Sequence, residues 1–166
     1  MSEPTQTTVM QGLELIPPNA RVVTAMAAAE PQQFFAQLAN MIPDLKGVNI
    51  YCANPSRDYE CFKAEPHSLA HVRFNVMFLT SKVRQYQGDG FINYVPQHLS
   101  QWSSNLTRNQ DVDVFWGSCT PPDENGFVSL GPSNCYESDM VRRARIKILE
   151  VNPNLPRTFG ASMVEL

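Results

Sequence analysis

The chain has 166 residues, of which 43% are hydrophobic and 17% charged. This is about one domain's worth of sequence, and its composition is too apolar for a disordered protein. A formal net charge of −3 gives no basic surface for a nucleic-acid backbone. No stretch reaches the ~20 apolar residues of a membrane span, and the first residues have no secretory signal. We therefore expect a soluble cytoplasmic protein that binds neither nucleic acid nor membrane.

Short strands and short helices alternate along the sequence. Residues 1–19 read as a polar lead-in or a short helix, and residues 20–166 as one domain. Strands are expected at 21–26, 48–53, 72–79, 91–95, 112–119 and 146–151, the last two as central strands. Helices are expected between Pro31 and Pro43, at 82–87, around 99–106, and from Asn134 through Ala144, with Asn134 and Glu137 forming a capping-box-like start. The alternation predicts an α/β domain with an open, mainly parallel sheet and helices on both faces.

The cysteines and the basic run carry no clear site. Cys52, Cys61, Cys119 and Cys135 form no C-x-x-C pair, so we expect reduced thiols and no metal. The basic run at 142–147 is better explained by a solvated helix end than by an anion-binding patch.

Three loops follow strands of the expected sheet, where ligands of open α/β folds bind. The first, at 25–31, includes Ala27, Glu30 and Pro31. Its small side chains suit close approach of a ligand, and the helix that follows offers free amides to an anion. Tight packing of strand against helix explains the same residues equally well.

The second loop, at 78–84, also leads from a strand into a helix. Thr80 and Ser81 have hydroxyls that suit a polar substrate group. The alternative, which we favour for either residue alone, is that the hydroxyl caps the helix.

The third loop, at 119–131, turns through two prolines and Gly126. Its neighbouring acids, Asp123 and Glu124, suit turn chemistry better than an acid–base pair, because adjacent side chains on a turn point apart.

Four other residues are weaker candidates. His67 and His71 lack a third metal ligand and are expected to be structural or surface residues. Ser118 and Cys119 lack the sequence context of a nucleophile.

Four motifs in order give the chain a resemblance to a known family. They are E-P-Q at 30–32, F-I-N-Y-V-P-Q-H-L-S-Q at 91–101, T-P-P-D-E-N-G-F-V-S-L-G at 120–131, and E-V-N-P-N-L-P-R-T-F-G at 150–160. Together they cover nearly residues 20–160. This pattern resembles the N-terminal half of the acetyl-CoA hydrolase/transferase family, relatives of 4-hydroxybutyrate CoA-transferase.

The resemblance implies an enzyme of two α/β domains with the active site between them. In that family, a glutamate of the C-terminal half attacks an acyl-CoA thioester, and the reaction proceeds through a glutamyl-CoA thioester. The resemblance therefore implies no catalytic residue in this chain, which alone is expected to be inactive. Its expected ligands are coenzyme A, as acyl-CoA, and a carboxylate, and its expected partner is a catalytic domain in cis or in another chain. The substrate-facing residues that it implies are Ala27, Glu30, Pro31, Thr80, Ser81, Lys82, Tyr94, Pro96, Ser118 and Gly126.

The chain departs from the family pattern in the second loop. Where the family has glycine and asparagine, this sequence has Thr80 and Lys82. These bulkier side chains keep an alternative open, a half-domain that binds acyl-CoA or docks a partner without chemistry. A sugar-phosphate isomerase-like enzyme of the same broad fold is a weaker alternative, because fold alone carries little functional information. An apolar face left open for a second domain predicts self-association.

Overall fold

The computed structural model describes residues 4–63, 68–88, 90–108 and 110–166. Its helices are α1 (Val9–Glu14), α2 (Gln32–Met41), α3 (Ser81–Arg84), α4 (Trp102–Thr107) and α5 (Glu137–Arg143). Its strands are β1 (Arg21–Thr24), β2 (Val48–Cys52), β3 (Val72–Val76), β4 (Ile92–Tyr94), β5 (Val114–Cys119), β6 (Phe127–Ser129), β7 (Ile146–Val151) and β8 (Met163–Glu165).

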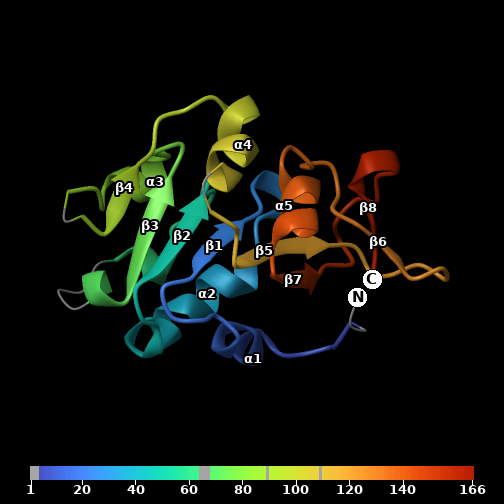
Figure 1. The fold of residues 1–166 in the computed structure, drawn as a ribbon, viewed down its shortest axis with the longest axis horizontal. Coiled ribbons are helices and arrows are strands. Elements are labelled where there is room, and N and C mark those ends of the chain that lie inside the picture. The colour runs from blue at the N-terminus through green and yellow to red at the C-terminus, as the bar shows by residue number, and fades with distance from the viewer. Residues whose placement is uncertain (1–3, 64–67, 89, 109) are drawn as a thin grey trace.

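Six of these strands form one parallel sheet in the order β4-β3-β2-β1-β5-β7, which runs across the molecule in Figure 1. Each connection between neighbouring strands crosses over through a helix, a helical turn or a longer loop, as parallel pairing requires. The open parallel α/β sheet expected from the alternating pattern is therefore confirmed.

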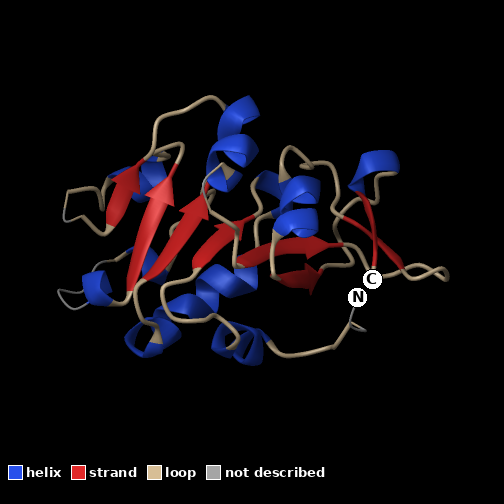
Figure 2. Ribbon diagram, in the orientation of Figure 1, coloured by secondary structure: helices blue, strands red, loops and turns tan. Residues whose placement is uncertain are grey.

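Helices cover both faces of the sheet (Figure 2). On one face α1 and α2 pack against Val22, Ile50 and Phe74. On the other, α4 and α5 pack against Val23 and Phe115. A strand that is buried on both sides reads as a continuous apolar run, and all six residues of β5 are buried.

The helix α2 forms where its apolar spacing indicated. Phe34, Phe35 and Leu38 are buried on one side of it, and Pro31 lies at its N-cap position. The helix passes into a short turn at Ile42–Asp44, which contains the proline expected to end it.

The expectation that β7 is a central strand is wrong. β7 pairs with β5 on one side and forms an edge of the sheet, and its residues are only half-buried or exposed. After β4 the chain returns to the opposite side of β1, so β5 is inner and β7 is outer. The apolar residues of β7 therefore pack on one neighbouring strand only.

The start of α5 differs from a capping box by one residue. The Asn134 side chain accepts from the Ser138 amide at 3.0 Å, and Glu137 Oε2 accepts from the Cys135 and Tyr136 amides at 2.7 and 2.9 Å. Tyr136 takes the N-cap position and makes no side-chain cap. The two predicted residues do satisfy the helix start, although with other partners.

Candidate functional site

The carboxyl ends of the parallel strands meet at one edge of the sheet, here called the carboxyl edge. The strand order reverses between β1 and β5, which is where open α/β sheets leave a crevice for ligands. Ala25 lies directly after β1 and Ser118 near the end of β5, so the loops that follow them flank this point of the sheet.

The loop at 25–31 is held by contacts within the chain. Ala27 is exposed and has a φ of 52°, a left-handed conformation that few residues other than glycine adopt. Glu137 Oε1 accepts from the Met26 amide at 3.0 Å, and Ser133 Oγ accepts from the Ala28 amide at 2.9 Å. The first loop is thereby fastened to α5 and to the segment that leads into it.

The amides at the start of α2 are already paired with an anion of the chain itself. Glu150 of β7 accepts from the amides of Gln33 and Phe34 at 3.0 and 2.7 Å, and from the Trp116 indole at 3.2 Å. Burial raises the pKa of the Glu150 carboxyl, and these donors oppose that shift. The prediction that this helix start offers free amides to a ligand is therefore wrong.

Glu30 is buried rather than exposed to the crevice, with 3% of its surface accessible. Its carboxylate accepts from the Ser56 amide, from Ser56 Oγ and from the Tyr59 hydroxyl, at 2.8, 3.0 and 2.6 Å. Burial and this hydrogen bond raise the pKa of the Tyr59 phenol. The residue after it, Pro31, is also buried. Neither predicted residue presents its side chain openly, and the role of Glu30 is to hold the loop after β2.

A shallow depression of about 380 Å³ lies at the carboxyl ends of β3 and β4. It is lined by Phe78, Leu79, Thr80, Arg84 and Tyr94. Phe78 and Tyr94 are 45% and 49% exposed, so two large aromatic side chains are open to solvent at its rim. Apolar walls with few polar groups are typical of ligand sites.

The predicted residues of the second loop lie at or beside this depression. Thr80 precedes α3, but its hydroxyl donates to the Pro55 carbonyl at 2.9 Å and makes no helix cap, so the capping interpretation is wrong for this residue. Ser81 and Lys82 are exposed in the first turn of α3, and Pro96 is exposed after β4.

Ser118 and Cys119, at the end of β5, are both buried. Ser118 Oγ donates to the Glu30 carbonyl at 3.3 Å, which joins the end of β5 to the first loop. Burial raises the pKa of the Cys119 thiol to about 11, although the nearby Arg157 lowers it in part. A buried, protonated thiol is a poor nucleophile.

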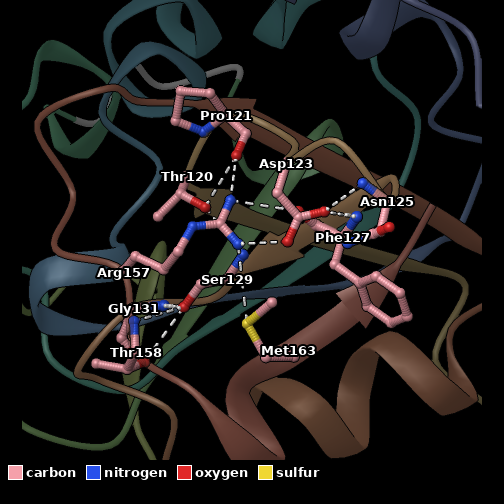
Figure 3. A network of polar contacts seen from close by, with 10 residues as sticks. All are labelled: Thr120, Pro121, Asp123, Asn125, Phe127, Ser129, Gly131, Arg157, Thr158 and Met163. Atoms are coloured by element: carbon pink, nitrogen blue, oxygen red, sulfur yellow. Dashed lines mark hydrogen bonds and ion pairs between the residues drawn. The ribbon is translucent and has the colours of Figure 1, made fainter.

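The third loop is organised by Arg157, which comes from the fourth motif (Figure 3). Its guanidinium donates to the carbonyls of Pro121 and Phe127 at 2.6 and 3.3 Å, and pairs with the Asp123 carboxylate at 3.2 Å. Asp123 also accepts from the amides of Asn125 and Phe127, as a turn residue does. The turn interpretation of Asp123 is confirmed.

The third and fourth motifs thus form one unit beyond the carboxyl ends of β5 and β7. Here β6 pairs with β8 in an antiparallel ladder. The sequence did not indicate β8. Ser129 Oγ accepts from the Gly131 and Thr158 amides at 3.1 and 3.0 Å. Gly126 occupies an open turn with a φ of 80°, and the residues that line the depression do not include it.

A second, polar depression of about 500 Å³ lies at the opposite, amino edge of the sheet. Arg21, Asn49, Tyr51, Asp113 and Arg145 are among the residues that line it. The Arg21 guanidinium lies 5.2 Å from the centre of the Tyr51 ring and donates to three carbonyls, so its charge is largely used within the fold.

The remaining candidates have structural roles or lie outside the described residues. His71 Nδ1 lies 2.7 Å from the Leu45 carbonyl, which confirms its structural role, and His67 lies outside the described residues. In the described part of the chain, no three His, Cys, Asp or Glu side chains group as a metal site would need. None of the helices described here has the length and apolarity to span a bilayer.

Residues 11–164 match the family described as the acetyl-CoA hydrolase/transferase N-terminal domain. The chain belongs to this family. Butyryl-CoA:acetate CoA-transferase of Anaerostipes caccae is 31% identical over 74% of the chain, and 4-hydroxybutyrate coenzyme A transferase of Clostridium kluyveri is 28% identical over 96%. The crystal structure of RipA from Yersinia pestis covers 96% of the chain with a TM-score of 0.84 and 27% identity.

The chain spans 28% and 37% of the two curated relatives and 39% of the RipA chain. The resemblance inferred from the four motifs is therefore confirmed, and the two curated relatives are CoA-transferases. The family identity implies CoA thioesters as the substrates of such enzymes.

The residues that hold the loops together could not be recognised from the sequence. Ser56 and Tyr59 accompany no motif, and Phe78 reads as the end of a buried strand although it is exposed. Only the chain's fold shows that they belong to the carboxyl edge.

Proposed function

We propose that this chain is the substrate-facing N-terminal domain of an acyl-CoA:carboxylate CoA-transferase or acetyl-CoA hydrolase. The observation that carries the proposal is the open aromatic depression at the carboxyl edge of a domain that belongs to this family. The depression would form one wall of the acyl and carboxylate pocket, beside the loops at 25–31, 93–96 and 118–131. Ala27 and Pro96 would contribute exposed backbone, Gly126 a half-buried turn, and Lys82 a charge at the rim.

The proposed chemistry needs a carboxylate nucleophile from a second domain. That glutamate attacks the thioester carbonyl, and the C–S bond breaks to give an acyl-glutamyl anhydride and CoA thiolate. The thiolate then attacks the glutamyl carbonyl and releases the acyl group as its carboxylate, leaving a glutamyl-CoA thioester. The acceptor acid reverses both steps, whereas in a hydrolase water cleaves the thioester.

The glutamates of this chain support a nucleophile elsewhere. Glu30, Glu137 and Glu150 each accept two or more hydrogen bonds from the fold and are buried or half-buried. A carboxylate held in this way is poorly placed to attack a substrate. The domain boundary near residue 20 and a cytoplasmic location belong to the same proposal.

Two exposed apolar side chains of the fourth motif support a covering domain or subunit. Val151 at the end of β7 is 58% exposed and Phe159 is 78% exposed. A covering domain or subunit would bury such exposed apolar side chains. We expect the isolated chain to self-associate, and a monodisperse monomer in light scattering would contradict this.

A thioester-exchange assay on the complete gene product tests the proposal. Incubation with butyryl-CoA and acetate should yield acetyl-CoA and butyrate, and intact mass should show a CoA adduct that hydroxylamine removes. The isolated chain should show no turnover.

The second candidate is a half-domain that binds acyl-CoA without chemistry. It is favoured by Thr80, whose hydroxyl already donates a hydrogen bond to the Pro55 carbonyl. Binding of butyryl-CoA by the complete gene product without exchange or hydrolysis would support it against the enzyme.

A further inference from the structure

Glu30 connects more loops of the carboxyl edge than its motif indicates. Its two carboxylate oxygens accept three hydrogen bonds, and all three donors belong to residues 53–59, the segment that follows β2. Charged acceptors make the stronger hydrogen bonds, and a buried donor that loses its acceptor is costly. The position of this segment therefore depends on the Glu30 carboxylate.

The segment at 53–59 in turn holds the residues after β3. Thr80 Oγ1 donates to the Pro55 carbonyl at 2.9 Å, and the Phe78 amide donates to the Ala53 carbonyl at 2.8 Å. Phe78 and Thr80 both line the depression. Two sets of hydrogen bonds thus join Glu30 to the wall of the depression without contact between Glu30 and its lining.

The same segment is anchored in the core on its other side. The Tyr59 ring stacks on the Phe35 ring of α2 with centroids 5.0 Å apart, and Tyr59 is 8% exposed. The Glu30 main chain is also fixed, because its carbonyl accepts from Ser118 Oγ. Glu30 therefore lies between the end of β5, which fixes its main chain, and the segment at 53–59, which its side chain holds.

We propose that Glu30 is a positioning residue that sets, through residues 53–59, where Phe78 and Thr80 stand, and so determines which acyl chains the depression accepts. This inference rests on the proposed function, because selectivity is defined only for an acyl-CoA enzyme. Glu30 takes no part in bond making, and its carboxylate does not touch the acyl group.

The test compares Glu30→Gln with Glu150→Gln in the complete gene product. Both substitutions replace a carboxylate that accepts three hydrogen bonds with an amide of the same shape, but Glu150 holds α2 rather than the depression. We expect both to lower the midpoint of thermal unfolding. Only Glu30→Gln should change the ratio of kcat/KM for butyryl-CoA over acetyl-CoA, by about tenfold and mainly through KM, since a few methylene contacts are worth that much.

Thr80→Val tests the second link. It removes the hydroxyl that reaches Pro55 and keeps the size of the side chain, so it should shift the same ratio in the same direction. Because both residues act on one wall, the double variant should change the ratio by less than the product of the two single fold-changes.

Hydrogen exchange gives a readout that does not need activity. Glu30→Gln should speed exchange of the Ser56 and Phe78 amides, whereas Glu150→Gln should speed exchange of the Gln33 and Phe34 amides. The inference is overturned if the Phe78 amide stays as protected as in the wild type. It is also overturned if Glu150→Gln shifts the acyl ratio as much as Glu30→Gln. A wild-type protein with neither thioester exchange nor thioester hydrolysis would refute the proposed function instead. The hydrogen exchange of the Phe78 amide would still decide whether Glu30 positions this wall.

Discussion

Removal of the Arg157 side chain should destabilise the domain more than loss of an ordinary surface arginine. Arg157 joins the third and fourth motifs through two carbonyls and the carboxylate of Asp123 (Figure 3). Its side chain is 26% exposed and that of Asp123 is 32% exposed, so solvent screens the ion pair only in part. Arg157→Ala leaves these acceptors without their donor.

The magnitude follows from the number and type of contacts. A hydrogen bond from a charged donor contributes about 1.5–3 kcal/mol, and a fully exposed ion pair about 0–1 kcal/mol. Water replaces part of what is lost at a half-exposed site, so we expect a decrease of about 2–3 kcal/mol in the free energy of unfolding. For a chain of this length this corresponds to a fall in Tm of about 4–12 °C.

The matched control is Arg145→Ala. Arg145 pairs with Asp111 at 3.0 Å, but their side chains are 67% and 73% exposed. We expect a loss of about 0–1 kcal/mol there. Urea unfolding followed by tryptophan fluorescence measures both variants, and Arg157→Lys should fall between them because it keeps the charge without the planar fork. Equal midpoints for Arg157→Ala and Arg145→Ala would refute the account of the third loop.

Four further predictions follow from single residues. Gly131→Ala should lower the free energy of unfolding by about 2–4 kcal/mol, because φ is 75° and a Cβ would lie 2.8 Å from a leucine side chain. Gly126→Ala, at φ 80° in open space, should lower it by only about 1–2 kcal/mol, the backbone strain alone. Equal urea midpoints for the two variants would contradict this. Burial raises the pKa of the Glu137 carboxyl. Its contribution to stability is therefore present below its unfolded pKa and is lost as pH rises through the folded pKa. The stability of the wild type relative to Glu137→Gln should fall as pH rises above the unfolded pKa. Hydrogen bonds from Ser103 and then Arg142 lower the pKa of Asp139, so relative to Asp139→Asn the wild type should lose stability as pH falls through the folded pKa. The two pH slopes should have opposite signs, and slopes of the same sign would contradict one of the two assignments. Cys135 is the exposed thiol among the four, so a thiol reagent should label one site in the native protein and the other three only after unfolding, and labelling of two or more native thiols would contradict the described burial.

The strands were predictable because their apolar runs reflect burial on both faces, as in β5. The same reasoning failed for the position of β7, since an edge strand of a parallel sheet has a similar apolar sequence and only the strand order distinguishes it. β8 is three residues long and carries no periodic signal, and its partner β6 lies far away in the sequence.

The site was predictable at the level of loops but not of side chains. The alternation of strands and helices indicated the carboxyl edge, and Thr80 and Tyr94 do line its depression. The carboxylates of Glu30 and Glu150 could not be assigned from sequence, because their partners are separated from them by 26 to 117 residues. A helix start considered alone has free amides, and Glu150 shows that the fold can supply the anion itself.

The most direct test of the account is a map of amide chemical shifts in the complete gene product during titration with butyryl-CoA. We predict the largest changes at Phe78, Leu79 and Tyr94, which line the depression at the carboxyl edge. Changes concentrated at Arg21, Tyr51 and Arg145, around the larger polar depression at the amino edge, would contradict the assignment of the carboxyl edge as the substrate-facing surface.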